Sequence, residues 1–502
     1  MSIHRRLLPR DRGSRRWGSL TFIALFGLVC WFYGPVLRDP NGHVFATGGD
    51  GLKNYFTFAY HVTNDSSWVD CAGVNYPYGE LVFFSDGHPA LSWALQALPF
   101  THGHVVGILN TLLLVGLIAY GMLVFVLLRR FGLAGWAATA GAFGLTVLQP
   151  QIFRLEGHFA LAHAWMLPLA WYLHLRARAA PKPLKWSIAV ATLLTLAYFT
   201  HPYMGLMLSL FLGAAALLLA VRSRQDRRLA ILDGIVQAAF PLLLFVLVLK
   251  AVDHHADRPD TPNTGEDNLA SVGGLCMPHH PSHLQPLTDL WADHEPSWES
   301  WCYLGVATMA VLLISAIVQL VKWSRRSGPL PDRTRDDVSL YLGAGFIVLF
   351  FAMGLHKPIE SVLPVLKQFR GAARFAWVFY LTAGVFGLSR LYNWVVARPS
   401  GRRRWGVVVF MIAPLLSSIE GWPHWQWSGE AVARGANPFT AEGLTADQRA
   451  LVNAAREEHP IALLPLPFEH SGSEVYQHGG PGAVFQSAYP MSYHTGTPVL
   501  AG

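Results

Sequence analysis

The most prominent pattern along the chain is a series of apolar runs, each about as long as a membrane-spanning helix. They fall near residues 17–37, 103–128, 133–150, 158–175, 185–200, 203–221, 229–251, 303–323, 339–355, 372–395 and 405–419. About 20 apolar residues in a helix cross a bilayer, and lipid forces such segments to be helical because it offers the backbone amides no partner. The pattern predicts an all-α polytopic membrane protein with about 11 transmembrane helices.

The positions of lysine and arginine set the orientation of these helices. Basic clusters occupy every second connection, beginning at the N-terminus and continuing at 129–130, 176–185, 222–228, 322–335 and 398–404. Cytoplasmic loops carry such an excess of lysine and arginine. The alternation therefore predicts an integral membrane protein with an inside N-terminus and an outside C-terminus.

The first apolar run follows an arginine-rich start, as a signal peptide would. The apolar core of a signal peptide has about 7–15 residues and ends at a small-residue cleavage site. The run at 17–37 is longer and ends in Tyr33-Gly34-Pro35, which is a poor cleavage site. We interpret it as a retained first helix.

Long outside segments divide the chain into two regions. Residues 1–420 form a transmembrane domain with outside loops at 38–102 and 252–302, and residues 421–502 form an extracytoplasmic C-terminal tail. The capping pattern of Thr445 and Gln448 predicts a helix that ends near Glu458, and the apolar run 461–466 predicts a strand. Because this strand has no partner visible in the sequence, we expect an α/β tail that is small or truncated.

Composition supports a membrane protein and narrows its partners. Charged residues make up 14% of the chain, against about 25% in soluble domains, so most of the surface does not face water. The net charge of +7 resides in short clusters between the apolar runs. This distribution is typical of cytoplasmic loops and argues against a nucleic-acid partner.

The first outside loop contains a candidate catalytic acid, Asp50, between Gly49 and Gly51. Glycines on both sides allow a tight turn that presents the carboxylate. Close to the membrane surface, partial desolvation would raise the pKa of this acid and suit it to act as a base. The alternative is structural, with Asp50 as the cap of a helix over 51–61.

The same loop carries further polar side chains among aromatic and turn residues, namely Lys53, Asn54, Glu80, Asp86 and His88. Aromatic faces combined with a few hydrogen-bonding groups are typical of ligand pockets, including carbohydrate sites. An aromatic belt at the membrane interface is the alternative. It explains the tyrosines of the loop better than it explains the two acids and the histidine.

Other outside connections contribute ionisable residues. Glu156 and His158 lie in the second connection, His163 follows them, and His201 lies at the junction of two predicted helices. Ionisable groups at or within membrane helices are costly and usually functional. We expect Glu156, His158 and His201 to bind substrate and leave His163 open, because five positions separate it from His158 and the two do not share a helix face.

Arg370 and Arg374 precede the predicted helix at 372–395 and lie four residues apart. Two arginines at the outside surface are unusual under the positive-inside rule. Arginine binds phosphate oxygens bidentately, which predicts a lipid-phosphate site. The alternative is snorkelling towards lipid headgroups.

The second long loop holds two further features that the sequence leaves open. Several histidines occur there, and they are either metal ligands or solvated side chains: His254, His255, His279, His280 and His283. Cys276 and Cys302 either form a disulfide or remain free thiols.

Together these positions resemble the glycosyltransferase C superfamily (GT-C). The resemblance covers roughly residues 1–420 and rests on the topology, on Gly49-Asp50-Gly51, on Glu156-Gly157-His158, and on the arginines before the tenth helix. The motifs of the first loop are similar to those of uncharacterised bacterial members that carry a soluble C-terminal region.

This resemblance implies an inverting glycosyltransferase of the bacterial cytoplasmic (inner) membrane. It would move a sugar from a polyprenyl-phosphate-linked donor to a glycan, lipid or protein acceptor on the outer face. Asp50 would be the general base, Arg370 and Arg374 would hold the lipid phosphate, and Glu156 and His158 would orient a substrate or bind a divalent metal. The cytoplasmic loops contain no P-loop or Rossmann fingerprint, which argues against a nucleotide-sugar donor.

Two other classes of function remain as alternatives. A transporter or flippase of lipid-linked or small polar substrates predicts polar residues deep in several helices and repeated halves. The sequence instead places its acids and histidines mainly at the outside ends of helices. A non-catalytic scaffold for envelope assembly would tolerate the substitution Asp50→Asn, whereas an enzyme would not.

Overall fold

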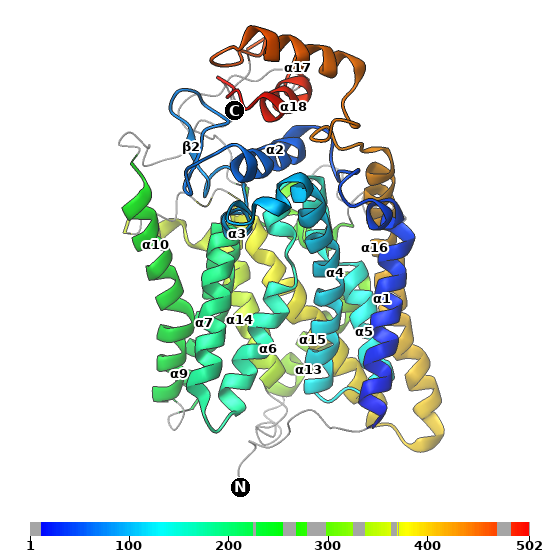
Figure 1. Ribbon diagram of the computed structural model, residues 1–502. Helices are drawn as coiled ribbons and strands as arrows, with labels where there is room; N and C mark the ends of the chain where they lie inside the picture. The colour runs from blue at the N-terminus through cyan, green and yellow to red at the C-terminus, as the bar shows by residue number, and fades with distance from the viewer. Residues whose placement is uncertain are drawn as a thin grey trace.

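The computed structural model describes residues 12–223, 227–254, 268–278, 298–324, 337–362, 369, 371–468 and 483–500. Long helices run side by side through it and form the bundle in Figure 1. In chain order, the helices of this bundle are α1 (Arg12–Arg38), α4 (Val105–Arg130), α5 (Gly135–Val147), α6 (Met166–Ala179), α7 (Pro183–Thr200), α8 (Pro202–Arg222), the short α9 (Arg227–Asp233), α10 (Phe240–Val252), α13 (Val306–Ser324), α14 (Asp337–Phe350), α15 (Ala376–Val396) and α16 (Ser400–Arg434).

Short helical segments connect these long helices. A π-helix, η4 (Gly234–Ala239), joins α9 to α10, and a second, η8 (Phe351–Leu355), follows α14. The remaining short helices are η1 (Pro99–His104), η2 (Pro150–Glu156), η3 (Phe159–Ala162), α11 (Val272–Cys276), η6 (Trp298–Ser300), η9 (Lys357–Ile359) and η11 (Ala372–Phe375).

Each apolar range predicted from the sequence overlaps a helix of the bundle. Among the described residues, seven helical segments have the length and hydropathy to cross a membrane: Arg15–Arg38, Pro99–Arg130, Pro202–Arg222, Arg227–Val252, Asp337–Leu355, Ala372–Val396 and Arg404–Arg434. The protein is therefore an integral membrane protein. The total of about eleven spans stays a prediction, because α5 and α6 have 13 and 14 residues, fewer than the ~20 that span a bilayer.

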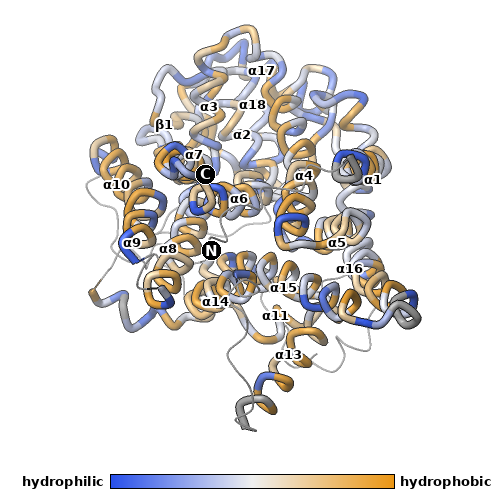
Figure 2. The backbone as a smooth tube through the Cα atoms, turned by 90° about the horizontal axis from the view of Figure 1, so that it is seen from below, coloured by the Kyte–Doolittle hydropathy of each residue, from blue (hydrophilic) through white to orange (hydrophobic). Residues whose placement is uncertain are grey.

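Apolar side chains determine which helices lie inside the bundle and which face lipid. The apolar window of α15 is buried throughout. In contrast, α1 and α13 expose large apolar side chains such as Trp31 and Leu313, which are 77% and 62% exposed. Figure 2 shows hydrophobic residues along the peripheral helices of the bundle. Contiguous exposed apolar surface of this kind is typical of a protein surrounded by lipid.

A smaller layer of structure covers one end of the bundle, here called the α2 end (Figure 1). It comprises α2 (Gly49–Thr63), β1 (Asp70–Cys71), β2 (Glu80–Leu81) and α3 (Pro89–Gln96) from the first loop, together with α17 (Ala446–Glu458) and α18 (Phe485–Thr495) from the tail. The strands β1 and β2 pair antiparallel, with Asp70 opposite Leu81.

The tail packs directly on α2. The rings of Phe56 and Tyr489 stack with centroids 4.5 Å apart, and the Tyr60 hydroxyl donates to the Gly496 carbonyl at 2.8 Å. The Val499 amide donates to the Gly73 carbonyl at 3.0 Å. Segments more than 400 residues apart in the chain therefore hold the first loop in place.

The structure confirms part of the predicted tail and corrects the rest. The capping box of α17 is present, with Gln448 N–H donating to Thr445 Oγ1 and Thr445 N–H donating to Gln448 Oε1. The predicted strand at 461–466 is wrong, because Leu463 makes only one isolated parallel bridge, to Val499. Tertiary pairing with the end of the chain takes the place of a strand partner.

Two further expectations can be compared with the fold. α16 continues to Arg434, beyond the predicted end at 419, because the second half of the helix is packed into the bundle: Trp425 is fully buried and its indole N–H donates to the Val147 carbonyl at 3.0 Å. All four cysteines are free, so Cys276 and Cys302 follow the free-thiol alternative.

Candidate active site

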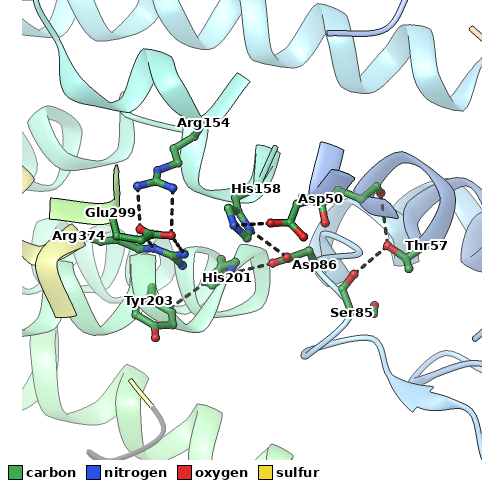
Figure 3. A network of polar contacts seen from close by, with 11 residues as sticks. Asp50, Thr57, Ser85, Asp86, Arg154, His158, His201, Tyr203, Glu299 and Arg374 are labelled. Atoms are coloured by element: carbon green, nitrogen blue, oxygen red, sulfur yellow. Dashed lines mark hydrogen bonds and ion pairs between the residues drawn. The ribbon is translucent and has the colours of Figure 1, made fainter. Parts of the chain in front are cut away.

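Four side chains from separate parts of the sequence form a continuous series of polar contacts at the α2 end. We call Asp50, His158, Asp86 and His201 the acid–histidine chain (Figure 3). Asp50 Oδ2 lies 3.3 Å from His158 Nε2, and His158 Nδ1 lies 3.2 Å from Asp86 Oδ2. Asp86 Oδ1 lies 3.0 Å from His201 Nε2. The sequence predicted all four as site residues, and the fold brings them together.

Hydrogen bonding defines the tautomer of His201 and the partners of His158. The His201 Nδ1 atom accepts from the Tyr203 backbone N–H at 3.2 Å, so Nε2 carries the proton and donates to Asp86. Both ring nitrogens of His158 face carboxylate oxygens, so its imidazolium form can donate to both acids.

Asp86 is the acceptor that joins the two histidines. Burial alone would raise its pKa, but the hydrogen bonds and charges of His158 and His201 outweigh burial and hold the pKa of Asp86 well below its usual range. The carboxylate therefore stays ionised at neutral pH and fixes the orientation of both rings.

The local structure around Asp50 brings its carboxylate to His158. A Cβ at Gly51 would lie 2.7 Å from the Glu156 carbonyl oxygen, and a Cβ at Gly157 would lie 3.2 Å from the Asp50 Cβ. Only glycine permits this close approach of the two backbones without displacement. Gly51, one of the two glycines predicted to shape a turn, therefore forms a contact surface between α2 and η2 together with Gly157.

The structure corrects two expectations about Asp50. Gly48, not Asp50, is the N-cap residue of α2, and Asp50 lies in the first turn, where its charge suits the positive end of the helix dipole. The Asp50 side chain is 59% exposed, so the predicted desolvation is wrong. The carboxylate therefore remains accessible to an incoming group while it contacts His158.

Three residues around the site have strained backbones. Asp86, His88 and His158 have φ angles of +58°, +48° and +55°, a left-handed conformation that is uncommon for residues with a side chain. Such strain costs free energy and concentrates at functional sites, where surrounding structure imposes it. Its occurrence at three predicted site residues supports a functional assignment of this region.

A second cluster adjoins the first, and we call it the arginine–glutamate triad. Glu299, from η6, accepts hydrogen bonds from both Arg154 and Arg374. The contacts to Arg154 measure 3.3 and 2.8 Å, and those to Arg374 measure 2.8 and 2.5 Å. Burial would raise the pKa of Glu299, but the two guanidinium charges lower it below its usual range. Glu299 is therefore an ionised carboxylate between two cations.

Tyr203 connects the triad to the acid–histidine chain (Figure 3). Its ring centroid lies 4.9 Å from Arg374 Cζ and 5.4 Å from the ring of His201. The Gly371 backbone N–H donates to its hydroxyl at 2.9 Å. The arginines and the acids therefore belong to one continuous polar region at the α2 end.

The other predicted substrate-binding residues lie at different distances from this region. Glu156 is half-buried in η2, and burial raises its pKa to about 8. His88 is buried with its ring 5.4 Å from that of His163, and burial lowers its pKa well below the usual range. On α2, Lys53 is half-exposed and Asn54 is buried.

Glu80 lies in β2, where the Leu81 backbone N–H donates to its carboxylate at 2.8 Å. Arg370 lies outside the described residues, as do His255, His279, His280 and His283 of the proposed histidine cluster.

The sequence did not single out Glu299, Tyr203 or Arg154 as site residues. Glu299 lies between Trp298 and Trp301 in the second long loop. An acid in such surroundings indicates a buried ion pair, but the sequence gives no indication of the partner. The triad joins positions 145 and 75 residues apart.

The described side chains do not fit the divalent metal that the resemblance allows. In this part of the chain, no group of three or more His, Cys, Asp or Glu side chains is arranged to hold a metal ion. Both ring nitrogens of His158 already face carboxylates.

The fold of this membrane protein is similar to that of solved archaeal oligosaccharyltransferases. The crystal structure of the apo oligosaccharyltransferase of Archaeoglobus fulgidus matches with a TM-score of 0.51 and 15% identity, over 97% of this chain and 65% of that chain. AglB of the same organism, in complex with an inhibitory peptide and a dolichol-phosphate, matches with a TM-score of 0.51 and 14% identity, over 98% of this chain and 65% of that chain. A structure of that oligosaccharyltransferase with Zn and sulfate gives 0.51 and 15%, over 96% and 62%.

These matches establish the fold alone. The chain spans less than two thirds of the length of the archaeal oligosaccharyltransferases that it matches. By sequence, the chain belongs to the DUF6311 family, described as a domain of unknown function, whose family model matches residues 22–416. No curated protein matches the sequence.

Proposed function

We infer that the protein is a membrane glycosyltransferase that transfers a sugar from a polyprenyl-phosphate-linked donor to an acceptor, with inversion. The observation that carries this proposal is the convergence of Asp50, Asp86, His158, His201 and Arg374 at one end of an oligosaccharyltransferase-like bundle. The same end carries the loop and tail layer. We propose that it faces the outside of a bacterial cytoplasmic membrane, with the N-terminus inside and the C-terminus outside.

Asp50 is the proposed general base. Its carboxylate is exposed on one side and positioned by His158 on the other. An acceptor hydroxyl that approaches from the open side would pass its proton to Asp50 as its oxygen attacks the anomeric carbon. The bond from that carbon to the donor phosphate breaks on the opposite face of the sugar, so the configuration inverts.

Arg374 is the proposed cation for the departing phosphate, with Arg370 beside it in sequence. Arginine stabilises phosphate oxygens bidentately, and charge that develops on the leaving group is stabilised most strongly in a site that excludes water. Arg374 is 9% exposed. Asp50 and Arg374 belong to adjoining clusters joined through Tyr203. One can therefore act as the base while the other stabilises the departing phosphate.

The remaining predicted residues would hold the substrates. Asp86 and His201 orient His158, and Glu156 lies beside the contact between α2 and η2. Lys53, Asn54, Glu80 and His88 are proposed to line the region that receives the sugar or the acceptor. Single substitutions at these positions would identify the groups that touch substrate.

A transporter or flippase is the second candidate, favoured by a polar network inside the bundle. Gln237 in η4 donates to Ser187 at 2.8 Å and to Asp233 at 2.9 Å, and lies 2.7 Å from His174. Ionisable residues within the membrane often mark transport pathways. Here, however, these side chains mainly bond to one another and tie α6, α7 and α9 together, which favours a structural role.

The test is sugar transfer in membranes that contain the wild-type protein or single variants. Radiolabelled polyprenyl-phosphate sugars would be supplied as donors, and the protein level would be matched. We expect wild-type transfer to fall by about 10²-fold or more in Asp50→Asn, because proton abstraction by a positioned base contributes about that much. Arg374→Ala should also reduce transfer strongly.

Matched controls separate the site from general damage. Asp70→Asn changes another acid of the first loop, bonded to the Ser67 hydroxyl at 2.8 Å, and Arg390→Ala changes another arginine on α15, bonded to Ser339 at 2.9 Å. Both should retain transfer. Equal transfer by Asp50→Asn and wild type would exclude Asp50 as the base, and uptake or flipping of the donor without transfer would favour the transporter.

A further inference from the structure

We propose that Arg154 and Arg374 together form one anion-binding site, and that Glu299 occupies it as an internal anion which a phosphate group must displace. This inference rests on the proposed glycosyltransferase function, in which the lipid-linked sugar donor carries the phosphate. It adds Arg154 as a phosphate ligand and gives Glu299 a role as competitor of the substrate.

The geometry of the triad is that of an occupied anion site. Glu299 Oε1 receives one hydrogen bond from Arg154 Nη1 and one from Arg374 Nη2, and Oε2 receives one from Arg154 Nη2 and one from Arg374 Nε. Each carboxylate oxygen therefore contacts both guanidinium groups. Arginine uses the same forked arrangement for carboxylates and phosphates, so the two arginines are already spaced to hold two oxygens of one phosphate group.

Burial and charge make the site sensitive to its occupant. Arg154, Glu299 and Arg374 are 2%, 3% and 9% exposed. Two cations and one anion leave an excess positive charge within the triad. Removing the anion from two buried arginines is costly, so the site requires some anion, and a phosphate with a higher charge can replace a single carboxylate.

The position of the triad suits a leaving phosphate. Tyr203 lies between Arg374 and His201 and joins the triad to the acid–histidine chain. A sugar between the two clusters would have a base on one side and the arginines on the other. Arg374 alone offers one fork, whereas the pair offers two, which is the stronger site for the charge that develops on the phosphate.

The segment that carries Glu299 is anchored next to the carboxylate, so displacement concerns the side chain. The Cys302 N–H donates to the Gly274 carbonyl at 2.8 Å, and the Leu304 N–H donates to the Leu275 carbonyl at 3.0 Å. A Cβ at Gly274 would lie 2.1 Å from the Ser300 carbonyl oxygen. These contacts hold the backbone in place, so the displacement that we propose is a rotation of the glutamate side chain away from the arginines.

The test measures phosphate binding without turnover. Purified full-length wild type and Glu299→Gln would be titrated with inorganic phosphate and with farnesyl phosphate, and both Kd and the midpoint of thermal unfolding would be recorded. Removal of the competing charge should lower the Kd of the variant by about tenfold or more. Phosphate should also raise the thermal midpoint of the variant more than that of wild type, because it replaces the missing anion.

Two further variants make the result decisive. The double variant Glu299→Gln/Arg154→Gln should lose the gain in affinity, because one of the two forks is gone. Asp233→Asn removes another buried carboxylate, paired with Arg178 at 3.3 Å in a different part of the bundle. Phosphate should not rescue its stability, and equal rescue of Asp233→Asn and Glu299→Gln would overturn the proposal.

If Glu299→Gln does not fold even in phosphate, Glu299→Asp answers the same question. Its carboxylate is one methylene shorter and cannot keep all four contacts, so its Kd for phosphate should still lie below that of wild type. An unchanged Kd in the folded variants overturns the internal-anion role. A gain for farnesyl phosphate alone identifies a lipid phosphate as the occupant, and an equal gain for both ligands identifies phosphate itself.

The outcome is independent of the transfer assay. If wild type transfers sugar and depends on Arg374 but Glu299→Gln binds phosphate as wild type does, the proposed function stands and this inference fails. If phosphate binding responds to Glu299 and Arg154 but no donor supports transfer, the anion site stands and the proposed enzymatic function fails.

Discussion

At the scale of single residues, the site combines groups whose charge is fixed by partners with groups whose charge is changed by burial. Asp86 and Glu299 stay ionised, because histidines and arginines outweigh the cost of burial. Glu156 behaves in the opposite way: its burial raises the pKa to about 8, although Arg154 opposes the shift. At neutral pH this glutamate is mostly protonated, so it can donate a hydrogen bond where Asp86 can only accept one.

The raised pKa of Glu156 predicts a pH-dependent stability. The folded protein binds this proton more tightly than the unfolded chain, so the contribution is fully present below the ordinary pKa of 4.5 and is lost as pH rises to about 8. The thermal midpoint of wild type should therefore fall between these pH values. Glu156→Gln should flatten this part of the curve, whereas Glu430→Gln, at an exposed i,i+4 ion pair, should keep it. The same slope in Glu156→Gln and wild type would contradict the assignment.

At the scale of elements, α2 is positioned from two sides. Its first turn touches the η2 backbone through Gly51 and Gly157, and its later turns carry Phe56 and Tyr60, which contact the tail. Contacts with both the bundle and the tail therefore fix the position of α2, and with it the position of Asp50. A helix fixed at one end only would leave the carboxylate free to move away from His158.

The glycine contact predicts a specific sensitivity of α2. In Gly51→Ala the added methyl would lie 2.4 Å from Ala46 Cβ and 2.7 Å from the Glu156 carbonyl oxygen, so α2 must shift. A displacement of about 1 Å at a catalytic group can reduce the rate by about 10²-fold. Sugar transfer should therefore fall strongly in this variant, with the protein still folded by its thermal midpoint.

Gly27→Ala provides the matched control for this prediction. Gly27 lies within α1, and no atom lies within 4 Å of an added Cβ, while alanine is the better helix former. Transfer by Gly27→Ala should equal that of wild type. Full activity of Gly51→Ala would show that the close approach of α2 and η2 is not required.

At the scale of the whole molecule, the bundle separates two ends of different character. The α2 end carries the first loop, the tail and both polar clusters, while the basic connections that follow α4, α6 and α8 lie at the opposite end (Figure 1). From the positive-inside rule, we propose that this opposite end faces the cytoplasm. The site would then open to the outside, where lipid-linked donors are the expected source of activated sugar.

Cysteine labelling from one side of the membrane tests this orientation. Asn453 on α17 and Lys182 before α7 are both exposed. With half-buried Cys30 and Cys276 replaced by alanine, an impermeant maleimide should label Asn453→Cys in intact cells and Lys182→Cys only after the membrane is opened. The reverse pattern would place the site at the cytoplasmic face and exclude the proposed topology.

The site residues were predictable to the extent that polar groups stand out among apolar segments. Asp50, Asp86, His158, His201 and Arg374 were visible because ionisable residues at helix ends in a membrane protein are rare and costly. The sequence did not show that Asp86 bridges two histidines, nor that Arg374 binds Glu299. These pairings join residues 72, 115 and 75 positions apart, so a local sequence pattern cannot predict them.

The sequence by itself determined the location and helical nature of the apolar segments, the capping box of α17, and the residue types available at the α2 end. Each of these follows from local interactions. An apolar run in lipid must form a helix because its backbone groups can pair only within the run, and a helix cap involves neighbouring residues. Only the tertiary structure decided which polar groups meet, why the run 461–466 forms a single bridge, and why α16 continues to Arg434. Those outcomes depend on contacts between distant segments, where packing and burial outweigh local preference.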